Sequence, residues 1–140
     1  MNFENSKMYP GLPEYFDNEG RGLYAYLTGA ASWYMLTMIT EVFGVKGDLG
    51  DLVIAPSLLP EQFDEKGSAG LKLEFARKKF EIIMHHPEKK DLRIEQIRRA
   101  VCDEKVVLEP EPEYGVRLRK SVIETLDQKK CHRIDVFFQE

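Results

Sequence analysis

Residues 28–31, with the sequence Thr-Gly-Ala-Ala, have the composition of a helix start whose backbone can hold an anion. Thr28 is a favourable N-cap residue, and Gly29, Ala30 and Ala31 leave the amides of the first turn uncovered. Exposed N–H groups and the positive end of the helix dipole bind anions, and phosphate fits such a site well. Small residues at a helix start also serve tight packing, so the spacing alone leaves both interpretations open.

The other reactive side chains show no spacing that defines a site. His85 and His86 are adjacent and would point to opposite faces of a strand, and no third histidine or cysteine stands at metal-ligand spacing. Cys131 and His132 are also adjacent, whereas catalytic partners meet in space and not in sequence. The acidic residues show no spacing that identifies an acid–base pair. We therefore predict no metal site and no cofactor, and the residue types alone place no catalytic residue.

The composition limits the classes of partner. The chain has 140 residues, of which 31% are charged, and a net charge of −4. This balance argues against a nucleic-acid or anionic-membrane partner, which would need a concentrated basic face. The two cysteines lie far apart and outside any Cys-x-x-Cys spacing, and the first residues lack the pattern of a signal peptide. We expect free thiols and a cytoplasmic protein.

The segment from Leu23 to Thr40 contains no charged residue. Threonine, serine, glycine and tyrosine dilute its apolar residues, and Glu41 closes it without a basic flank, so we do not expect a membrane span. The pattern predicts a helix over about 29–43 that ends at Gly44. A helix that is apolar on most sides belongs inside a larger helical assembly.

Beyond Gly44 the pattern becomes that of strands separated by turns. Asp48 and Asp51 are expected to serve a turn, and residues 109–115 an extended, solvated connection. Residues 120–126 predict a short helix. Strands are expected at 51–55, 71–75, 80–82, 92–94, 106–108 and 132–138. The sequence therefore predicts an α+β chain, with one helix ahead of an antiparallel β-sandwich-like module.

Residues 13–63 carry a motif long enough to indicate a family. It consists of Gly-Arg-Gly at 20–22, Tyr-x-x-x-Thr-Gly-x-Ala-x-Trp, Glu-Val-Phe-Gly-Val at 41–45, and Gly-Asp-Leu. This segment closely resembles the C-terminal part of the inverting glycoside phosphorylases, the cellobiose and chitobiose phosphorylase family (glycoside hydrolase family 94). The phosphorylase-like end of the cyclic β-1,2-glucan synthases is similar. The resemblance weakens beyond residue 63 but continues to the final strand.

The resemblance implies both a fold and a site. Residues 1–44 would be the last, incomplete segment of an (α/α)6 catalytic barrel, and residues 45–140 a small antiparallel jelly-roll-like β domain. In such enzymes inorganic phosphate, a substrate, attacks the anomeric carbon of a β-linked disaccharide while a carboxylic acid protonates the departing oxygen. The family's phosphate-binding Thr-Gly falls on Thr28 and Gly29. Where the family often has Ser, this chain has Ala30.

The resemblance also implies that the chain is incomplete as an enzyme. The family's general acid and its other phosphate-binding residues lie upstream and have no counterpart here. The expected partners are the upstream barrel part and carbohydrate, and self-association is expected when the barrel is missing. The alternative is a non-catalytic carbohydrate-binding or structural accessory module. In that case exposed aromatic residues would stack on sugar rings: Tyr15, Phe16, Tyr24 and Tyr26.

Overall fold

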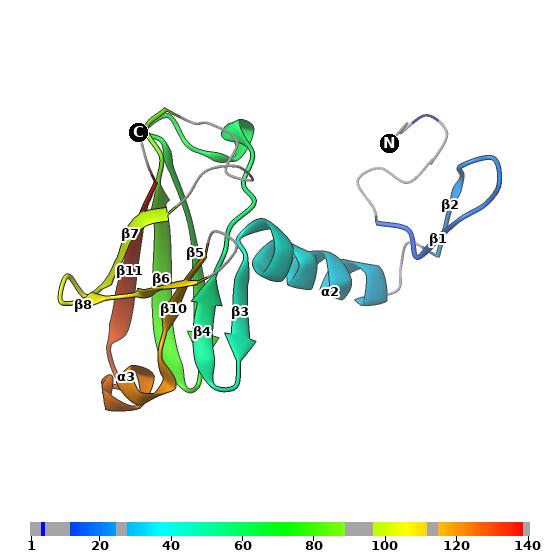
Figure 1. The fold of residues 1–140 in the computed structure, drawn as a ribbon. Helices are drawn as coiled ribbons and strands as arrows, with labels where there is room; N and C mark the ends of the chain where they lie inside the picture. Colours follow the sequence, from blue (N-terminus) through cyan, green and yellow to red (C-terminus); the bar gives the residue numbers. More distant parts are fainter. Residues whose placement is uncertain (1–3, 5–11, 25–27, 89–96, 112–114, 139–140) are drawn as a thin grey trace. The chain divides into compact units, whose positions relative to one another are not determined.

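The computed structural model describes residues 4, 12–24, 28–88, 97–111 and 115–138 (Figure 1). The chain divides into two compact units, residues 1–38 and 39–140. The domain boundary predicted from the sequence lies at residue 44. The observed division comes six residues earlier, because Ile39, Val42 and Phe43 pack against the core of the second unit.

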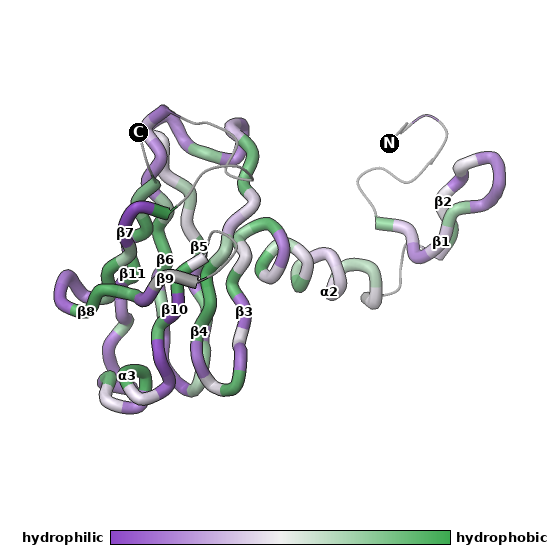
Figure 2. Tube along the Cα trace, viewed as in Figure 1, coloured by the Kyte–Doolittle hydropathy of each residue, from purple (hydrophilic) through white to green (hydrophobic). Residues whose placement is uncertain are grey.

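The first unit contains a short hairpin and a helix. Strands β1 (Tyr15–Phe16) and β2 (Gly22–Leu23) pair antiparallel. Helix α2 (Thr28–Thr37) begins one residue earlier than predicted, so Thr28 is its first residue and not its N-cap, and its apolar residues do not gather on one face. Figure 2 shows this helix in pale and green tones, in keeping with its lack of charged side chains. Within the described residues, no helix is long and apolar enough to cross a membrane.

The helical conformation continues into the second unit as a π-helical turn, η1 (Met38–Val42), and stops at Gly44 as predicted. Gly44 has a φ of +65°, and a Cβ built there would lie 1.9 Å from the carbonyl oxygen of Ala55. Only glycine combines this left-handed conformation with so close an approach of two backbone segments.

A four-stranded sheet follows, in the order β3-β4-β10-β9. Its strands are all antiparallel: β3 (Val45–Asp48), β4 (Asp51–Ile54), β9 (Glu109–Glu111) and β10 (Gly115–Leu118). Leu49 and Gly50 connect β3 to β4, and both have positive φ, as the tightest two-residue hairpin turns require. Asp48 and Asp51 flank this turn, which confirms the role expected for them.

A five-stranded sheet has the order β5-β6-β11-β7-β8. Its strands are β5 (Ser68–Phe75), β6 (Lys78–His85), β7 (Ile97–Cys102), β8 (Val106–Val107) and β11 (Cys131–Phe138). Strand β11 runs parallel to β6 and antiparallel to β7, so the sheet is mixed and not wholly antiparallel as predicted. The final strand thus joins two parts of the chain that are distant in sequence.

The two sheets form two layers around one apolar core, with helix α3 (Lys120–Thr125) at one end (Figure 1). A single turn of 3-10 helix, η2 (Pro60–Gln62), precedes β5 and has Pro60 at its first position. Alternate residues of the facing strands form the core, and the side chains of these residues are fully buried. They include Leu52, Ile54, Phe80, Ile82, Met84, Leu118, Ile134 and Val136. A sheet-rich unit with its own core follows from this period-two burial.

Several sequence predictions need correction. Residues 109–111 form strand β9, which pairs with β10, and are not a solvated connection. Strands β3, β7 and β10 are not predicted by the sequence pattern, because each is short or carries charged and small residues. The strand predicted over 92–94 lies outside the described residues.

Candidate functional site

The predicted anion site, Thr28 and Gly29, lies at the start of helix α2, with Thr28 inside the helix and not at the N-cap position. Thr28 is the first helical residue, Gly29 is exposed, and no acidic residue lies in the first turn. The Thr28 side chain lies outside the part of the chain that the structure describes. The amides of the first turn are therefore uncovered by their own side chains, and they need an acceptor from elsewhere.

The acceptor is a carboxylate from the preceding hairpin. The backbone N–H of Ala30 donates to Oε1 of Glu14 over 2.6 Å. A Cβ placed on Gly29 would lie 3.0 Å from the same oxygen, so glycine leaves the room that this carboxylate uses. An anionic group thus occupies the N-terminal end of α2, where the helix dipole favours negative charge.

The hairpin that carries Glu14 is fixed by local polar contacts. The Glu14 N–H donates to the carbonyl of Leu23 over 3.0 Å. At the turn, the Asp17 carboxylate accepts from the backbone N–H and the side-chain Nε of Arg21, at 2.9 and 2.7 Å. The backbone N–H of Arg21, together with its guanidinium, lowers the pKa of Asp17. The rings of Tyr15 and Tyr24 meet edge to face at 5.9 Å.

Five described carboxyl groups have a clearly lowered pKa: Asp17, Glu41, Asp51, Asp103 and Asp135. A general acid needs a pKa raised toward neutrality. None of these five groups is therefore a candidate for that role.

The histidines and cysteines are placed as strand geometry requires. His85 lies on the outer side of its sheet, whereas His86 is 2% exposed. Cys131 is exposed and His132 is buried, so the two do not meet. Burial raises the pKa of Cys102 to about 11, which leaves this thiol unreactive. No three potential metal ligands cluster within the described ranges.

Two charged clusters tie strands of the second unit together. Arg117 on β10 donates to Asp51 over 2.9 Å and to Asp48 over 2.8 Å. Buried His132 contacts the Asp103 carboxylate at 2.7 Å and the carbonyl of Asp127 at 2.8 Å. Both clusters join residues of distant segments, and the sequence gives no signal for either. We expect both clusters to stabilise the second unit.

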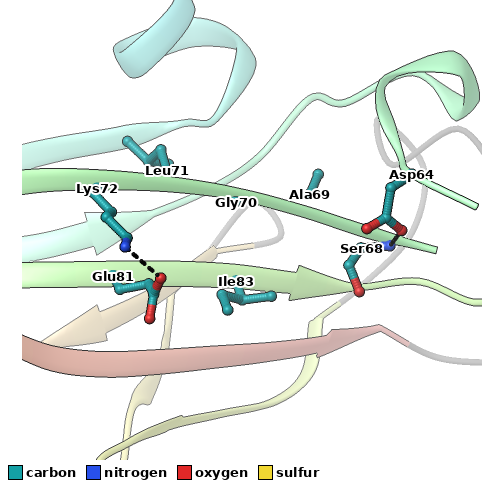
Figure 3. A pocket seen from close by; sticks show the side chains of 8 residues that line it. All are labelled: Asp64, Ser68, Ala69, Gly70, Leu71, Lys72, Glu81 and Ile83. Atoms are coloured by element: carbon teal, nitrogen blue, oxygen red, sulfur yellow. Dashed lines mark hydrogen bonds and ion pairs between the residues drawn. The ribbon is translucent and has the colours of Figure 1, made fainter. Parts of the chain in front are cut away.

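A shallow hollow lies on the outer face of the five-stranded sheet, over Gly70 (Figure 3). Its volume is about 330 Å³. Lys72 on β5 and Glu81 on β6 form an ion pair across one end at 3.2 Å. At the other end Asp64 accepts from the N–H of Ser68 over 2.8 Å. Sequence reasoning missed this hollow, although Gly70, the one glycine inside β5, marks a position without a side chain.

No protein-family model matches the chain, and a search of curated proteins finds no significant match.

Proposed function

We propose that the chain is the C-terminal part of an inverting glycoside phosphorylase and contributes part of its phosphate site. The observation that carries the proposal is a hydrogen bond at the start of helix α2, where the backbone N–H of Ala30 donates to the carboxylate of Glu14. It supports an anion-binding role for the same Thr28-Gly29 pair that the family resemblance implies. A helix start with free amides binds phosphate by the same interactions.

In the proposed reaction, phosphate occupies the position near the Ala30 amide and displaces the Glu14 carboxylate. The hydroxyl of Thr28 and the amide of Gly29 complete this side of the phosphate. A phosphate oxygen attacks the anomeric carbon, and the bond to the leaving sugar breaks as an acid protonates its oxygen. The products are a sugar 1-phosphate and a shortened saccharide. The acid and the remaining phosphate ligands come from the upstream part of the barrel.

The exposure of the large side chains of α2 supports the proposal that this helix packs against other helices. Trp33 is 69% exposed, and Tyr34 and Met35 are also more than half exposed. Exposed apolar surface of this kind, around a helix with no charged residue, is typical of an element that packs inside a larger assembly. We propose that α2 belongs to the last segment of an (α/α)6 barrel and that the second unit is its jelly-roll-like C-terminal domain.

The second candidate is a non-catalytic carbohydrate-binding accessory module. It is favoured by the exposed aromatic rings of the β1–β2 hairpin, because Tyr15, Phe16 and Tyr24 lie close together in the first unit and remain open to solvent. An upstream reading frame that encodes the rest of the barrel would favour the phosphorylase over this module.

Complementation tests the proposed function. The chain is co-expressed with the barrel of a cellobiose phosphorylase from which the corresponding C-terminal part has been removed, and sugar 1-phosphate is measured with cellobiose and inorganic phosphate. We expect product only when both parts are present. Product from the pure chain alone, or no product with a barrel that the chain demonstrably binds, contradicts the proposal.

A hydroxyl deletion then tests the site. Thr28→Val keeps the β-branched shape but removes the hydroxyl, and we expect phosphate affinity to fall roughly ten- to a hundredfold. Thr37→Val, at the other end of α2, is the matched control and leaves phosphate affinity unchanged. An unchanged phosphate dependence in the Thr28→Val complex would remove Thr28 from the site.

A further inference from the structure

A second hollow lies on the outer face of the five-stranded sheet, over strands β6, β11 and β7. Its volume is about 380 Å³. It is separate from the hollow over Gly70, which lies on the β5 side of β6. The residues that line it are His85, Arg99, Val101, Glu104, Arg133, Asp135 and Phe137. None of them belongs to the proposed phosphate site, and all lie in the second unit.

The register of the strands brings these residues together. Phe137 on β11 is the partner of His85 on β6 and of Arg99 on β7. Asp135, two residues earlier, has Ile83 and Val101 as its partners. Alternate residues of a strand point to the same face. Side chains from three strands therefore share one outward surface, while Ile134 and Val136 point into the core.

The centre of this surface is held rigidly by Asp135. Its carboxylate lies 2.7 Å from Nε2 of His85 and accepts from Nε and one terminal nitrogen of Arg133 at 2.8–3.0 Å. Burial raises the pKa of Asp135, but the hydrogen bonds from Arg133 and His85 outweigh it and the net direction is down. The His85 ring stacks on Phe137 with centroids 4.8 Å apart and an angle of 14° between planes. The result is a fixed aromatic and polar platform, with Phe137 39% exposed.

The edges of the hollow carry one charged group of each sign. Arg99 makes no ion pair or side-chain hydrogen bond with any described residue, and the carboxylate of Glu104 interacts with the charge of Arg133 without forming an ion pair among the described residues. Arg99 offers donors and Glu104 offers acceptors to a ligand. An anionic ligand would face the carboxylates of Glu104 and Asp135, and an apolar ligand would leave both charged edges desolvated. A neutral ligand with many hydroxyl groups satisfies donors and acceptors at once.

We propose that this outer face binds a neutral oligosaccharide. The hydroxyl groups of one sugar pair with Arg99 and Glu104, and its C–H face lies on the exposed part of Phe137. The hollow over Gly70 lies on the same outer face, on the other side of β6. Four neighbouring strands span about 14 Å, which is longer than one pyranose ring, so an oligosaccharide and not a monosaccharide matches the face.

The test is a titration of the whole chain, labelled with ¹⁵N, with cellotetraose as the neutral probe and no phosphate present. We expect fast-exchange shifts of backbone amides in β6, β7 and β11, with helix α2 unaffected. A ligand with a Kd of about 1 mM occupies roughly 90% of sites at about 10 mM probe. Absence of shifts at that concentration overturns the proposal, whether or not the complemented phosphorylase is active.

Two adjacent arginines give a matched pair of variants. Arg99→Ala removes a lining residue, and we expect affinity for cellotetraose to fall about tenfold. Arg98→Ala makes the same change of charge one residue away, outside the lining, and should leave affinity unchanged. Phe137→Ala, with folding checked by the dispersion of the amide spectrum, should abolish binding. Equal effects of the two arginine changes would contradict a site at this place.

Two further probes decide the class of ligand. A trisaccharide of galacturonic acid should bind more weakly than cellotetraose, because its carboxylates meet Glu104 and Asp135. Stronger binding of the acidic probe overturns the assignment to neutral sugars. Shifts on this face with the truncated barrel, and none with any saccharide, would assign the surface to a protein contact instead.

Discussion

The two units of the chain differ in how far their large apolar side chains are exposed to solvent. In the described part of residues 39–138, Phe80 and Ile134 are fully buried and most large apolar side chains join the core, whereas Leu49 and Val107 are exposed. In residues 12–38, Trp33, Tyr15 and Tyr24 are each more than 60% exposed. The second unit contains a core and the first has its apolar surface outside.

This difference indicates which unit can stand by itself. Burial of apolar area is the main favourable contribution to folding, and the second unit has one continuous core between two sheets. The first unit has a ten-residue helix and a two-residue-per-strand hairpin. Isolated helices of this length are marginal in water, so we expect α2 to be marginally stable without further packing. We infer that the first unit is a part of something larger.

The largest contrast is expected from one aromatic deletion in each unit. Phe80→Ala removes a fully buried ring and should lower the free energy of unfolding by about 3–5 kcal/mol. Trp33→Ala should change it by less than about 0.5 kcal/mol, because the ring is mostly in water. Urea unfolding followed by far-ultraviolet circular dichroism measures both. A cost above about 1.5 kcal/mol for Trp33→Ala would mean that the first unit has a core of its own.

Substitutions of two glycines, one in each unit, test the same difference between the units. Gly44→Ala forces a side chain into a left-handed conformation and against the Ala55 carbonyl, at a cost of about 3 kcal/mol. Gly29→Ala should be tolerated in the isolated chain, because only the flexible end of Glu14 must move. In the complemented enzyme the same change should weaken phosphate binding. Thermal unfolding of both variants gives the comparison, and equal stability of the two would contradict it.

The second unit should also lose stability in acid. Burial raises the pKa of Asp103, but hydrogen bonds from His132, the Arg133 amide and Lys130 outweigh it, so the pKa is lower in the folded chain. The contribution of Asp103 is therefore complete above the ordinary aspartate pKa of about 3.9 and is lost as pH falls through the lowered value. Asp103→Asn should cost about 2 kcal/mol at neutral pH and flatten this acid limb. Stability measured against pH tests it, and an unchanged acid limb in the variant would exclude Asp103 as a cause.

The smallest effect is expected at the carboxylate over α2. Glu14→Ala removes the acceptor of the Ala30 amide and should speed hydrogen exchange of that amide about two- to fivefold. Glu19→Ala, in the same hairpin but away from the helix, is the control. Equal exchange in the two variants would show that Glu14 does not cap the helix in solution.

Local patterns predicted the elements that local physics determines. The uncharged run and its glycine stop predicted a helix that stops at Gly44, and alternation predicted strands within β5 and β6. Strand β7 was not predicted, because Arg98 and Arg99 interrupt the alternation of apolar and polar residues. The pairing of β7 with β11 shifts register at the same place. The parallel pairing of β11 with β6 joins distant segments, and no local pattern encodes it.

The candidate sites differ in the same way, because some of their residues are neighbours in sequence and others meet only in the folded chain. The family resemblance assigns Thr28 and Gly29 to a phosphate site, and the residue types at this one place in the chain also fit tight packing. The carboxylate that lies over them comes from Glu14, which precedes Ala30 by 16 positions, and only the folded hairpin brings the two together. The outer-face hollow is less predictable still, because Arg99 and Phe137 meet only through the register of β7 and β11.

The fluorescence of Trp33, the single tryptophan of the chain, tests most directly whether α2 lacks its partner. For the chain alone, the account predicts the red-shifted, readily quenched emission of a free tryptophan derivative, unchanged when urea unfolds the second unit. Addition of the truncated barrel should shift the emission to the blue and protect it from acrylamide. Blue-shifted, protected emission in the monomeric chain alone, or emission that a bound barrel leaves unchanged, would contradict the account.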